Sequence, residues 1–580
     1  MKKTIFVRIR LGALTLLAVF LISISSFGSV AKKQELVLSG NTNSSSSSAQ
    51  LSSDDLNYVL AGSTTCTSGL IKPDQYLTNY TSKPQFRPGN TLPKLGQFGW
   101  GTSVETAIEL ATEWNYTLDF GNATSQSVAN MSNSATKEGK IIAKAKTDPA
   151  KYSLQVGVPR FDTASYPDDI WAHDAKGNLI LSGSSKVFSP EASGTSYRQI
   201  VEPIADNFRK IAKEAHIALI SNGGERDMGV PADQKATGDP KVKAAQGTKS
   251  WTDYMSERKA YQESITASAI MNAVPNMEMY LYYYSAAGST RNYGFWNQYM
   301  WNYDNMRGVS TLPNESMYFK QFNGGWIGSE SMLTQILNES GRQIQLGQPL
   351  SYNWLNGGWW PGVGANGGFG DLPTYQGFLK AYFTAGNIGG IAGYWDYPSS
   401  NPNADLNNGF GREGYDGFDS CMDPNIPFDY SLRNTQQPNS VPHWLTQQIV
   451  LSQAQAEFSW LEPFLRNGDL LPGDGVNHYS ADQPSYEFNT GYADTRVLAR
   501  KMKTSNEWIL TAWAADGVTR NVNVTVPGLG TVSLNAVPAA HVYYAKLNGS
   551  TPSVTQIDTD PLNPTPSAKT LWDTNVLPHS

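Results

Sequence analysis

The sequence predicts an α/β fold, a (β/α)8 TIM barrel, followed by a small all-β sandwich domain. Between about residues 95 and 395, short β-like runs alternate with longer amphipathic stretches, which is typical of parallel strands connected by helices. After about residue 465 this alternation stops. Short alternating runs separated by turn residues follow, as expected of antiparallel hairpins.

Composition narrows the class of protein. The chain has 580 residues, a formal net charge of −6, only 16% charged residues and 11% aromatic residues. Such a chain is long enough for a barrel plus a second domain, and it is not a disordered polymer. Because no sustained run of Lys and Arg is present to neutralise phosphates, we expect no nucleic-acid partner.

The amino terminus predicts export. Basic residues up to Arg10 precede an apolar run and then a group of small residues ending at Ala31, so residues 1–31 are expected to be a signal peptide. The alternative is an uncleaved membrane anchor. Residues 32–60 contain a serine run and are expected to form a flexible linker. The mature protein is therefore predicted to be secreted or periplasmic, with no membrane partner after cleavage.

Residues 61–465 are expected to form the barrel. The predicted strands cover residues 96–99, 116–120, 153–158, 217–221, 277–284, 317–322, 350–355 and 388–395. The predicted helices between and after them include residues 104–114, 197–215, 254–273, 329–345, 375–385 and 444–464. Strand and helix units in this number match a closed barrel. A doubly wound open sheet is the alternative, but no glycine fingerprint follows the first strand.

The remainder of the chain divides into two parts. Residues 466–550 contain alternating runs at 507–513, 521–526, 531–534 and 540–545 and are expected to form the antiparallel β-sandwich. Residues 551–580 are rich in Pro, Thr and Asp and are expected to be a tail.

Cys66 and Cys421 are the only cysteines. In an oxidising compartment they either pair, joining the start of the folded part to a late loop, or remain free. No set of His and Cys has the spacing of a zinc site, so we expect neither a metal nor another cofactor.

Polar and aromatic residues accumulate where the predicted strands end, which is where barrel loops converge. Carboxylates, amides and indoles suit sugars, whose hydroxyls form hydrogen bonds and whose C–H faces stack on aromatic rings. The substrate is therefore expected to be a polysaccharide or oligosaccharide. The candidate binding residues are Trp100, Asp119, Asp162, Asn222, Tyr282, Tyr284, Asn323, Trp326, Asn353, Trp354, Trp359 and Trp395.

Glycoside hydrolysis requires a general acid and a second carboxylate. Glu225, just after the fourth predicted strand, is the candidate acid, with Asp227 as its alternative. Asp396, at the end of the eighth strand, is the preferred second carboxylate. Because the fourth and eighth strands of a barrel face each other, this choice favours a wide separation of carboxylates and hence inversion. Glu330 and Asp119 are the other candidates for that role.

These motifs resemble those of secreted bacterial glycoside hydrolases with a barrel and a carboxyl-terminal β-sandwich, such as agarases and related galactan hydrolases. The resemblance depends on Asn222-Gly223-Gly224-Glu225, on Trp395-Asp396 and on the segment 464–471. The large retaining clan of such barrels carries adjacent Asn and Glu after strand four and a Glu after strand seven. Here two glycines separate Asn222 from Glu225, and no Glu occurs between Glu339 and Glu413.

The leading hypothesis is a secreted glycosidase. A catalytically silent carbohydrate-binding barrel is the second hypothesis, since strand seven carries Asn353 and no glutamate. A polysaccharide lyase, with His173, His443 or Tyr282–Tyr284 supplying a base, is the third. An esterase is disfavoured because no Gly-x-Ser-x-Gly elbow is present. The sequence does not indicate the oligomeric state.

Overall fold

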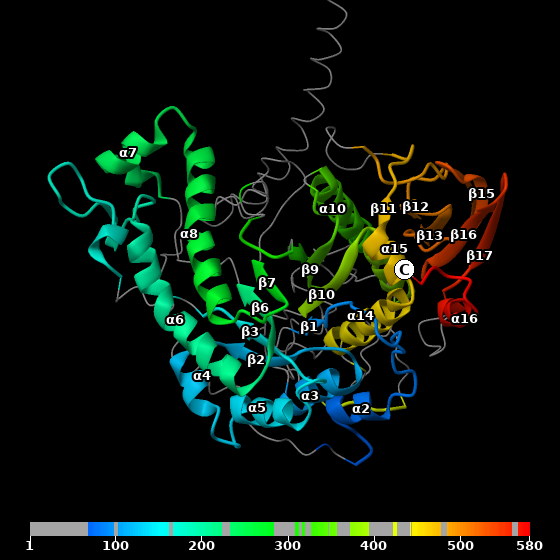
Figure 1. Cartoon of the computed structure of the whole chain (residues 1–580), viewed down its shortest axis with the longest axis horizontal. Coiled ribbons are helices and arrows are strands. Elements are labelled where there is room, and N and C mark those ends of the chain that lie inside the picture. Colours follow the sequence, from blue (N-terminus) through cyan, green and yellow to red (C-terminus); the bar gives the residue numbers. More distant parts are fainter. Residues whose placement is uncertain are drawn as a thin grey trace, which may run out of the picture. The chain divides into compact units, whose positions relative to one another are not determined.

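The computed structural model describes residues 66, 68–97, 103–159, 161, 166–222, 233–282, 305, 308–312, 316–318, 326–345, 347–356, 372–393, 421–425, 441, 443–476, 484–558 and 567–579. The predicted signal peptide and linker lie outside these residues. Residues 65–580 form one compact unit, which Figure 1 shows with helices and sheets labelled.

Eight parallel strands form two four-stranded sheets. They are β1 (Gly96–Gln97), β2 (Leu118–Asn122), β3 (Leu154–Gly157), β6 (Ile217–Asn222), β7 (Met279–Tyr282), β8 (Ser316–Tyr318), β9 (Ser351–Asn356) and β10 (Asn387–Gly393). The sheet orders are β2-β3-β6-β7 and β1-β10-β9-β8. A parallel bridge between Leu95 and Tyr116 joins the starts of β1 and β2. The predicted parallel α/β architecture is therefore confirmed, and the first strand pairs with the last.

Side chains from both sheets meet at Gly96 on β1. A Cβ atom there would lie 2.8 Å from Oε1 of Gln155 on β3, 2.8 Å from Cγ1 of Ile391 on β10 and 2.9 Å from Cδ2 of Leu219 on β6. No side chain fits at this point, because contacts below 3.0 Å require a neighbour to move. The strands that carry these residues are therefore curled around a shared, closely packed interior.

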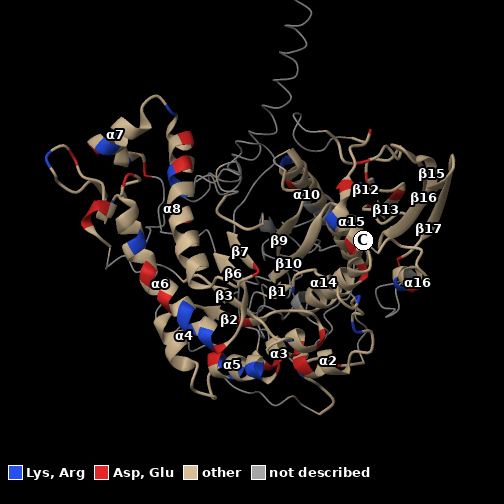
Figure 2. Ribbon diagram, in the orientation of Figure 1, with Lys and Arg blue, Asp and Glu red and all other residues tan. Residues whose placement is uncertain are grey.

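Helices connect the strands, and charged residues lie along several of them, including α5, α6 and α8 (Figures 1 and 2). The helices before and between the parallel strands are α2 (Pro73–Asn79), α3 (Val104–Glu113), α4 (Ser125–Asn130), α5 (Lys137–Thr147), α6 (Gly194–Glu214), α7 (Pro240–Gln246), α8 (Trp251–Ala273), α10 (Trp326–Gln345) and α11 (Leu372–Thr384). After them come α14 (His443–Ser459) and α15 (Glu462–Asn467).

Several helices begin where the sequence supplies a capping side chain. The hydroxyl of Ser103 accepts a hydrogen bond from the backbone N–H of Thr106 at the start of α3. Thr136 and Ser250 cap α5 and α8 in the same way. These caps satisfy backbone donors that have no partner in the first turn, so they fix where each helix begins. A short hairpin of β4 (Leu181–Ser182) and β5 (Ser185–Lys186) lies between β3 and α6.

The carboxyl-terminal part is antiparallel. A five-stranded sheet has the order β11-β12-β13-β16-β17, and β14 pairs with β15. The strands are β11 (Gly468–Leu470), β12 (Thr495–Met502), β13 (Glu507–Ala514), β14 (Arg520–Val526), β15 (Gly530–Ala536), β16 (His541–Asn548) and β17 (Thr551–Gln556). Strand β17 and helix α16 (Ser567–Asp573) occupy part of the stretch expected to be a tail.

Strand β13 is buried along its whole length because both of its faces are covered. Trp508 and Leu510 pack with the alternating valines of β14, whereas Ile509 and Trp513 belong to the core that contains α11 and α14. On α11, a Cβ atom at Gly377 would lie 2.3 Å from the Trp513 indole and 2.3 Å from a backbone carbonyl oxygen. The strand-and-helix part and the carboxyl-terminal sheet therefore share one closely packed interface.

A buried ion pair crosses this interface. The Nζ atom of Lys380 on α11 lies 3.0 Å from Oδ2 of Asp558 and donates to the carbonyl oxygen of Ala540 at 2.9 Å. Both side chains of the pair are at most 3% exposed. His541 Nδ1 lies 3.1 Å from the same carboxylate oxygen. Although burial acts to raise it, the charge of Lys380 and the hydrogen bonds with His541 and Lys380 hold the pKa of Asp558 below its usual value.

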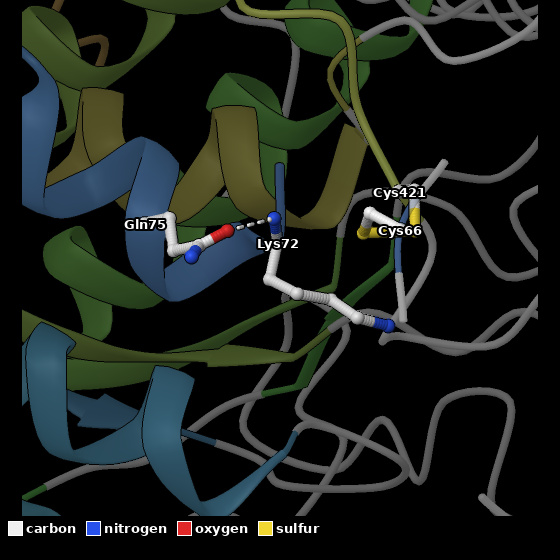
Figure 3. The surroundings of a disulfide bond; sticks show 4 residues. All are labelled: Cys66, Lys72, Gln75 and Cys421. Carbon is white, nitrogen blue, oxygen red and sulfur yellow. Dashed lines mark hydrogen bonds between the residues drawn. A yellow bond between two sulfur atoms is a disulfide. The ribbon is translucent and has the colours of Figure 1, made fainter. Parts of the chain in front are cut away.

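Cys66 and Cys421 form a disulfide with their Cα atoms 5.6 Å apart, so the paired alternative is correct (Figure 3). The adjacent segment is held by backbone hydrogen bonds between Ile71 and Met422. Just after it, the backbone N–H of Lys72 donates to the Gln75 side chain at 2.9 Å, at the start of α2. The disulfide and these bonds attach the beginning of the folded chain to the segment at residues 421–425.

Candidate functional site

The described candidate residues lie on four parallel strands. Asp119 is on β2, Asn222 ends β6, Tyr282 ends β7, and Asn353 and Trp354 are on β9. Because all of these strands are parallel, their carboxyl ends gather at one edge. The backbones of Trp326 and Glu330 belong to α10, and their side chains are outside the described atoms. The other candidates lie outside the described residues, namely Trp100, Asp162, Glu225, Tyr284, Asn323, Trp359, Trp395 and Asp396, as does Asp227.

Asn222 joins the end of β6 to a buried carboxylate. Its Nδ2 group donates to Oε2 of Glu263 on α8 and to the hydroxyl of Tyr280 on β7, each at 3.1 Å. Glu263 is fully buried, and Asn222 is only 2% exposed. Both amide hydrogens of Asn222 are thus used within the fold. Burial raises the pKa of the Tyr280 hydroxyl well above its usual value, so this phenol stays neutral.

Lys259 lies one helical turn before Glu263 on the same face of α8. Its Nζ atom is 4.0 Å from Oε1 of Glu263, and its side chain is 1% exposed. Burial lowers the pKa of Lys259 to about 8, while the neighbouring Glu263 acts to raise it. The end of β6 is therefore backed by an ionisable pair inside the protein.

Asn353 on β9 makes a contact with α10 that is similar to the contact of Asn222 with α8. Nδ2 of Asn353 donates to Oε2 of Glu339 at 2.7 Å and to Oδ1 of Asn387 at 2.8 Å. Gln343 donates to the other oxygen of Glu339 at 2.7 Å. Burial raises the pKa of Glu339 to about 8, and the bonds from Asn353 and Gln343 act in the opposite direction.

Trp354 lies on the opposite face of β9 from Asn353, because side chains alternate along a strand. It pairs in register with Ile391, the residue whose side chain converges on Gly96 in the interior. Trp354 therefore points towards the interior of the curled strands and is 9% exposed. Tyr282 pairs with Asn222 and so shares the face that carries the Glu263 contact. It is fully buried.

Asp119 is held by a cation. Its Oδ2 atom lies 2.7 Å from Nζ of Lys137, the first residue of α5, and Oδ1 accepts the backbone N–H of Gly121 at 3.2 Å. The charge of Asp119, the second residue of β2, is thus balanced by Lys137. Asp119 is a candidate for sugar binding and for the second carboxylate. Its side chain is less free to move and to accept new hydrogen bonds than an unpaired carboxylate would be.

Elsewhere, a hollow lined by Lys213, His216 and Asn276 lies beside the amino end of β6, at the opposite edge from the candidate residues. Among the described residues, no three His, Cys, Asp or Glu side chains are grouped so that they could hold a metal ion. No helix in the described ranges is long and apolar enough to cross a membrane.

Comparison with known proteins finds solved glycoside hydrolases. One is a family 39 glycoside hydrolase from Bacteroides cellulosilyticus WH2, at 8% identity and a TM-score of 0.37, with 77% of this chain and 78% of that chain covered. Another is a maltogenic α-amylase from Thermotoga neapolitana, at 9% identity and a TM-score of 0.34, covering 73% and 80%. A third is an agarase, AgWH50C, at 13% identity and a TM-score of 0.30, covering 63% and 49%.

All three structures are of glycoside hydrolases, the class of protein that the sequence motifs resemble, and the exact family stays unidentified. No family model matches the chain, and no curated protein matches it. Similarities at these TM-scores assign no activity to this chain.

Sequence reasoning missed Glu263, Lys259 and Glu339. Each belongs to a polar pair spaced four residues apart on a helix, Lys259 with Glu263 and Glu339 with Gln343. That spacing predicts contact between the two side chains, but it is equally common on exposed helix faces. Only the packing of α8 and α10 against the strands reveals that these pairs are buried.

Proposed function

We propose that this chain is a secreted glycoside hydrolase that cleaves a polysaccharide or oligosaccharide with two carboxylates in a (β/α)8 barrel. The observation that carries the proposal is the strand order. Eight parallel strands follow one another, with the first paired to the last, and this is the arrangement that gathers catalytic loops at one edge of a barrel.

The two carboxylates follow strands that a closed barrel would set across from each other. Glu225 comes three residues after the end of β6, the fourth strand, and Asp396 comes three residues after the end of β10, the eighth. We assign Glu225 as general acid and Asp396 as the base that activates water. Opposite strands favour a separation of roughly 6.5–9.5 Å and hence inversion. Glu330 on α10 is the alternative second carboxylate.

The described candidates offer a sugar hydrogen-bond acceptors more than stacking surfaces. Trp354 faces the interior of the strands and is only 9% exposed, so little of its indole is open for a pyranose to stack on. Asp119 on β2, although paired with Lys137, keeps carboxylate lone pairs for sugar hydroxyls. Export through the predicted signal peptide would bring the enzyme to polymers outside the cell, and the antiparallel carboxyl-terminal sheets would form the accompanying sandwich domain.

The test is reducing-end release by the purified mature protein on a panel of neutral and sulfated polysaccharides from plants, fungi and algae. We expect release from at least one polymer, abolished by Glu225→Gln and by Asp396→Asn while binding of that polymer is kept. Full activity in Glu225→Gln would refute the assignment of the acid. An unsaturated product that absorbs in the near ultraviolet would indicate a lyase instead.

One observation favours a second candidate, the catalytically silent carbohydrate-binding barrel. Strand β9 contains no glutamate, whereas the retaining clan has one after strand seven, and the amide of Asn353 on β9 is engaged by Glu339 inside the fold. Binding of a polymer without any release of reducing ends would support that function and would exclude hydrolysis.

A further inference from the structure

We propose that Glu263 and Lys259 are a buried positioning pair that, through Asn222, fixes the end of β6 for the reaction at Glu225. The inference rests on the proposed function, and it concerns residues outside the predicted catalytic set. Glu263 is fully buried on α8 and bonds to Asn222. It is therefore assigned a positioning role and no chemical step.

The first argument is the direction of α8. Val274, just after α8, and Ile217, at the start of β6, line the same hollow, whereas Glu263 contacts Asn222 at the end of β6. The 11 residues of helix and the five residues of strand between these two contacts each span about 16 Å. Helix and strand are therefore antiparallel and in step along their whole contact.

The second argument follows from that direction. Lys259 precedes Glu263 by four residues, so in this antiparallel arrangement it lies about 6 Å further along α8 in the direction of the carboxyl end of β6. The turns of α8 that precede Lys259, starting at Trp251, also lie beyond the end of β6, as Figure 1 shows. The ionisable pair thus sits at the level where the strand gives way to the predicted catalytic loop.

The third argument is energetic. A buried ion pair usually stabilises a protein no better than well-packed apolar residues of the same size, because both charges lose their hydration. Lys259 and Glu263 are at most 1% exposed, so stability alone gives little reason for them. What the pair does supply is a fixed acceptor for Asn222, whose two amide hydrogens are both used, by Glu263 and by Tyr280. This fixes the last residue of β6 in one orientation.

Catalysis is sensitive to such fixation. A displacement of about 1 Å in a catalytic group can cost about 100-fold in rate, even when its cause lies away from the reacting atoms. Loss of the Glu263 acceptor frees the end of β6, so it is expected to act on kcat more than on KM. A purely stabilising contact would change neither parameter in the folded enzyme.

The experiment measures kcat and KM of the mature protein on the polymer that the wild type cleaves. We expect Glu263→Ala to lower kcat about 10- to 100-fold with KM little changed. Glu263→Gln keeps an oxygen acceptor for Asn222 but removes the charge beside Lys259, so a smaller loss of about 3- to 10-fold is expected. Hydrogen exchange at residues 217–222 is expected to be faster in Glu263→Ala than in the wild type.

The matched control is Glu457→Gln. Glu457 is also a buried glutamate with a lysine near it. The charge of Lys380 acts to lower the pKa of Glu457, and Lys259 is the corresponding neighbour of Glu263. It lies two residues from Gln455, which bonds to Pro93 and Ile388 near the amino ends of β1 and β10. The control removes the same chemical group at the opposite edge of the strands and is expected to leave kcat and exchange at residues 217–222 unchanged.

The outcomes separate the two proposals. A wild type that releases no reducing ends refutes the proposed function, and the positioning role with it. An active wild type with a folded Glu263→Ala of normal kcat overturns the positioning role alone, as does an equal loss in Glu457→Gln. If Glu263→Ala fails to fold, Glu263→Gln decides, and wild-type kcat in that variant overturns the inference.

Discussion

Glu339→Gln is predicted to remove a stability loss that the wild-type protein suffers at alkaline pH. Glu339 is 2% exposed, and burial raises its pKa from 4.5 to about 8. The folded state then binds a proton that the unfolded state has lost between these two values, so stability falls as pH rises through this window. Glutamine has the same size and stays neutral, and its oxygen can accept the bond from Asn353.

The magnitude follows from the shift. At pH 5 the carboxyl costs less than about 1 kcal/mol relative to glutamine, and at pH 9 the cost approaches 5 kcal/mol, at about 1.36 kcal/mol per pKa unit. The difference in unfolding free energy between Glu339→Gln and the wild type should therefore shift in favour of the variant by up to about 4 kcal/mol from pH 5 to pH 9. The gain is an upper limit, because Gln343 must turn its amide to face the new NH2 group.

The assay is urea unfolding, followed by tryptophan fluorescence, of both proteins at pH 5 and pH 9. Glu457 and Glu487 also have pKa values raised to about 8 by burial, so the readout is the difference between the two proteins at each pH. Glu202→Gln, at an exposed ion pair with Arg209, is the control and should change little. An equal wild-type-to-variant difference at both pH values would refute a titrating Glu339.

Three further predictions test the interface and the disulfide. Gly377→Ala places a methyl group against the Trp513 indole and a backbone carbonyl oxygen, so it should destabilise the protein by about 1–3 kcal/mol in urea unfolding. An unchanged unfolding midpoint would contradict that contact. Asp558→Ala leaves Lys380 buried without its carboxylate and should cost about 3–5 kcal/mol, whereas a cost below 1 kcal/mol would mean that water reaches the lysine. A maleimide should label Cys66 and Cys421 only after reduction, and labelling of the denatured, unreduced protein would show that the disulfide is absent.

The sequence predicted the positions of the parallel strands well because most of them contain a short apolar run between longer helical stretches. The run expected at residues 217–221 is strand Ile217–Asn222, and the run expected at 350–355 is Ser351–Asn356. The run expected at 277–284 was too long at its start, since the structure begins it at Met279. Apolar composition marks where a strand exists, but the pairing partners decide where its ladder begins and ends.

The carboxyl-terminal part was harder to predict. Strand β17 reads Thr-Pro-Ser-Val-Thr-Gln, a polar sequence with four of its six residues exposed. It lies at the edge of the sheet, where its partner β16 supplies the ladder bonds and its own side chains contribute little burial. Composition therefore suggested a tail where tertiary pairing makes a strand.

The candidate site was predictable in position more than in role. Strand ends indicated Asn222 and Asn353 as polar groups at the mouth. Asn222 does end β6, whereas Asn353 is the third residue of β9, and both side chains bond to helices. Their partners, Glu263 and Glu339, belong to helices distant in the sequence. No local pattern reveals such a pairing, because the contact exists only after helix and strand have packed.

The bond between Cys66 and Cys421 also has a topological consequence. The polypeptide from residue 66 to residue 421 becomes a covalent ring that contains all eight parallel strands, from Gly96 to Gly393. A single cut by a protease anywhere within this ring releases no fragment, and the nicked molecule migrates as one species until it is reduced. The antiparallel sheets lie outside the ring and are tethered to it by one stretch of chain. If the chain is exported as proposed, one cut by a foreign protease would leave the part that carries its predicted catalytic residues covalently joined.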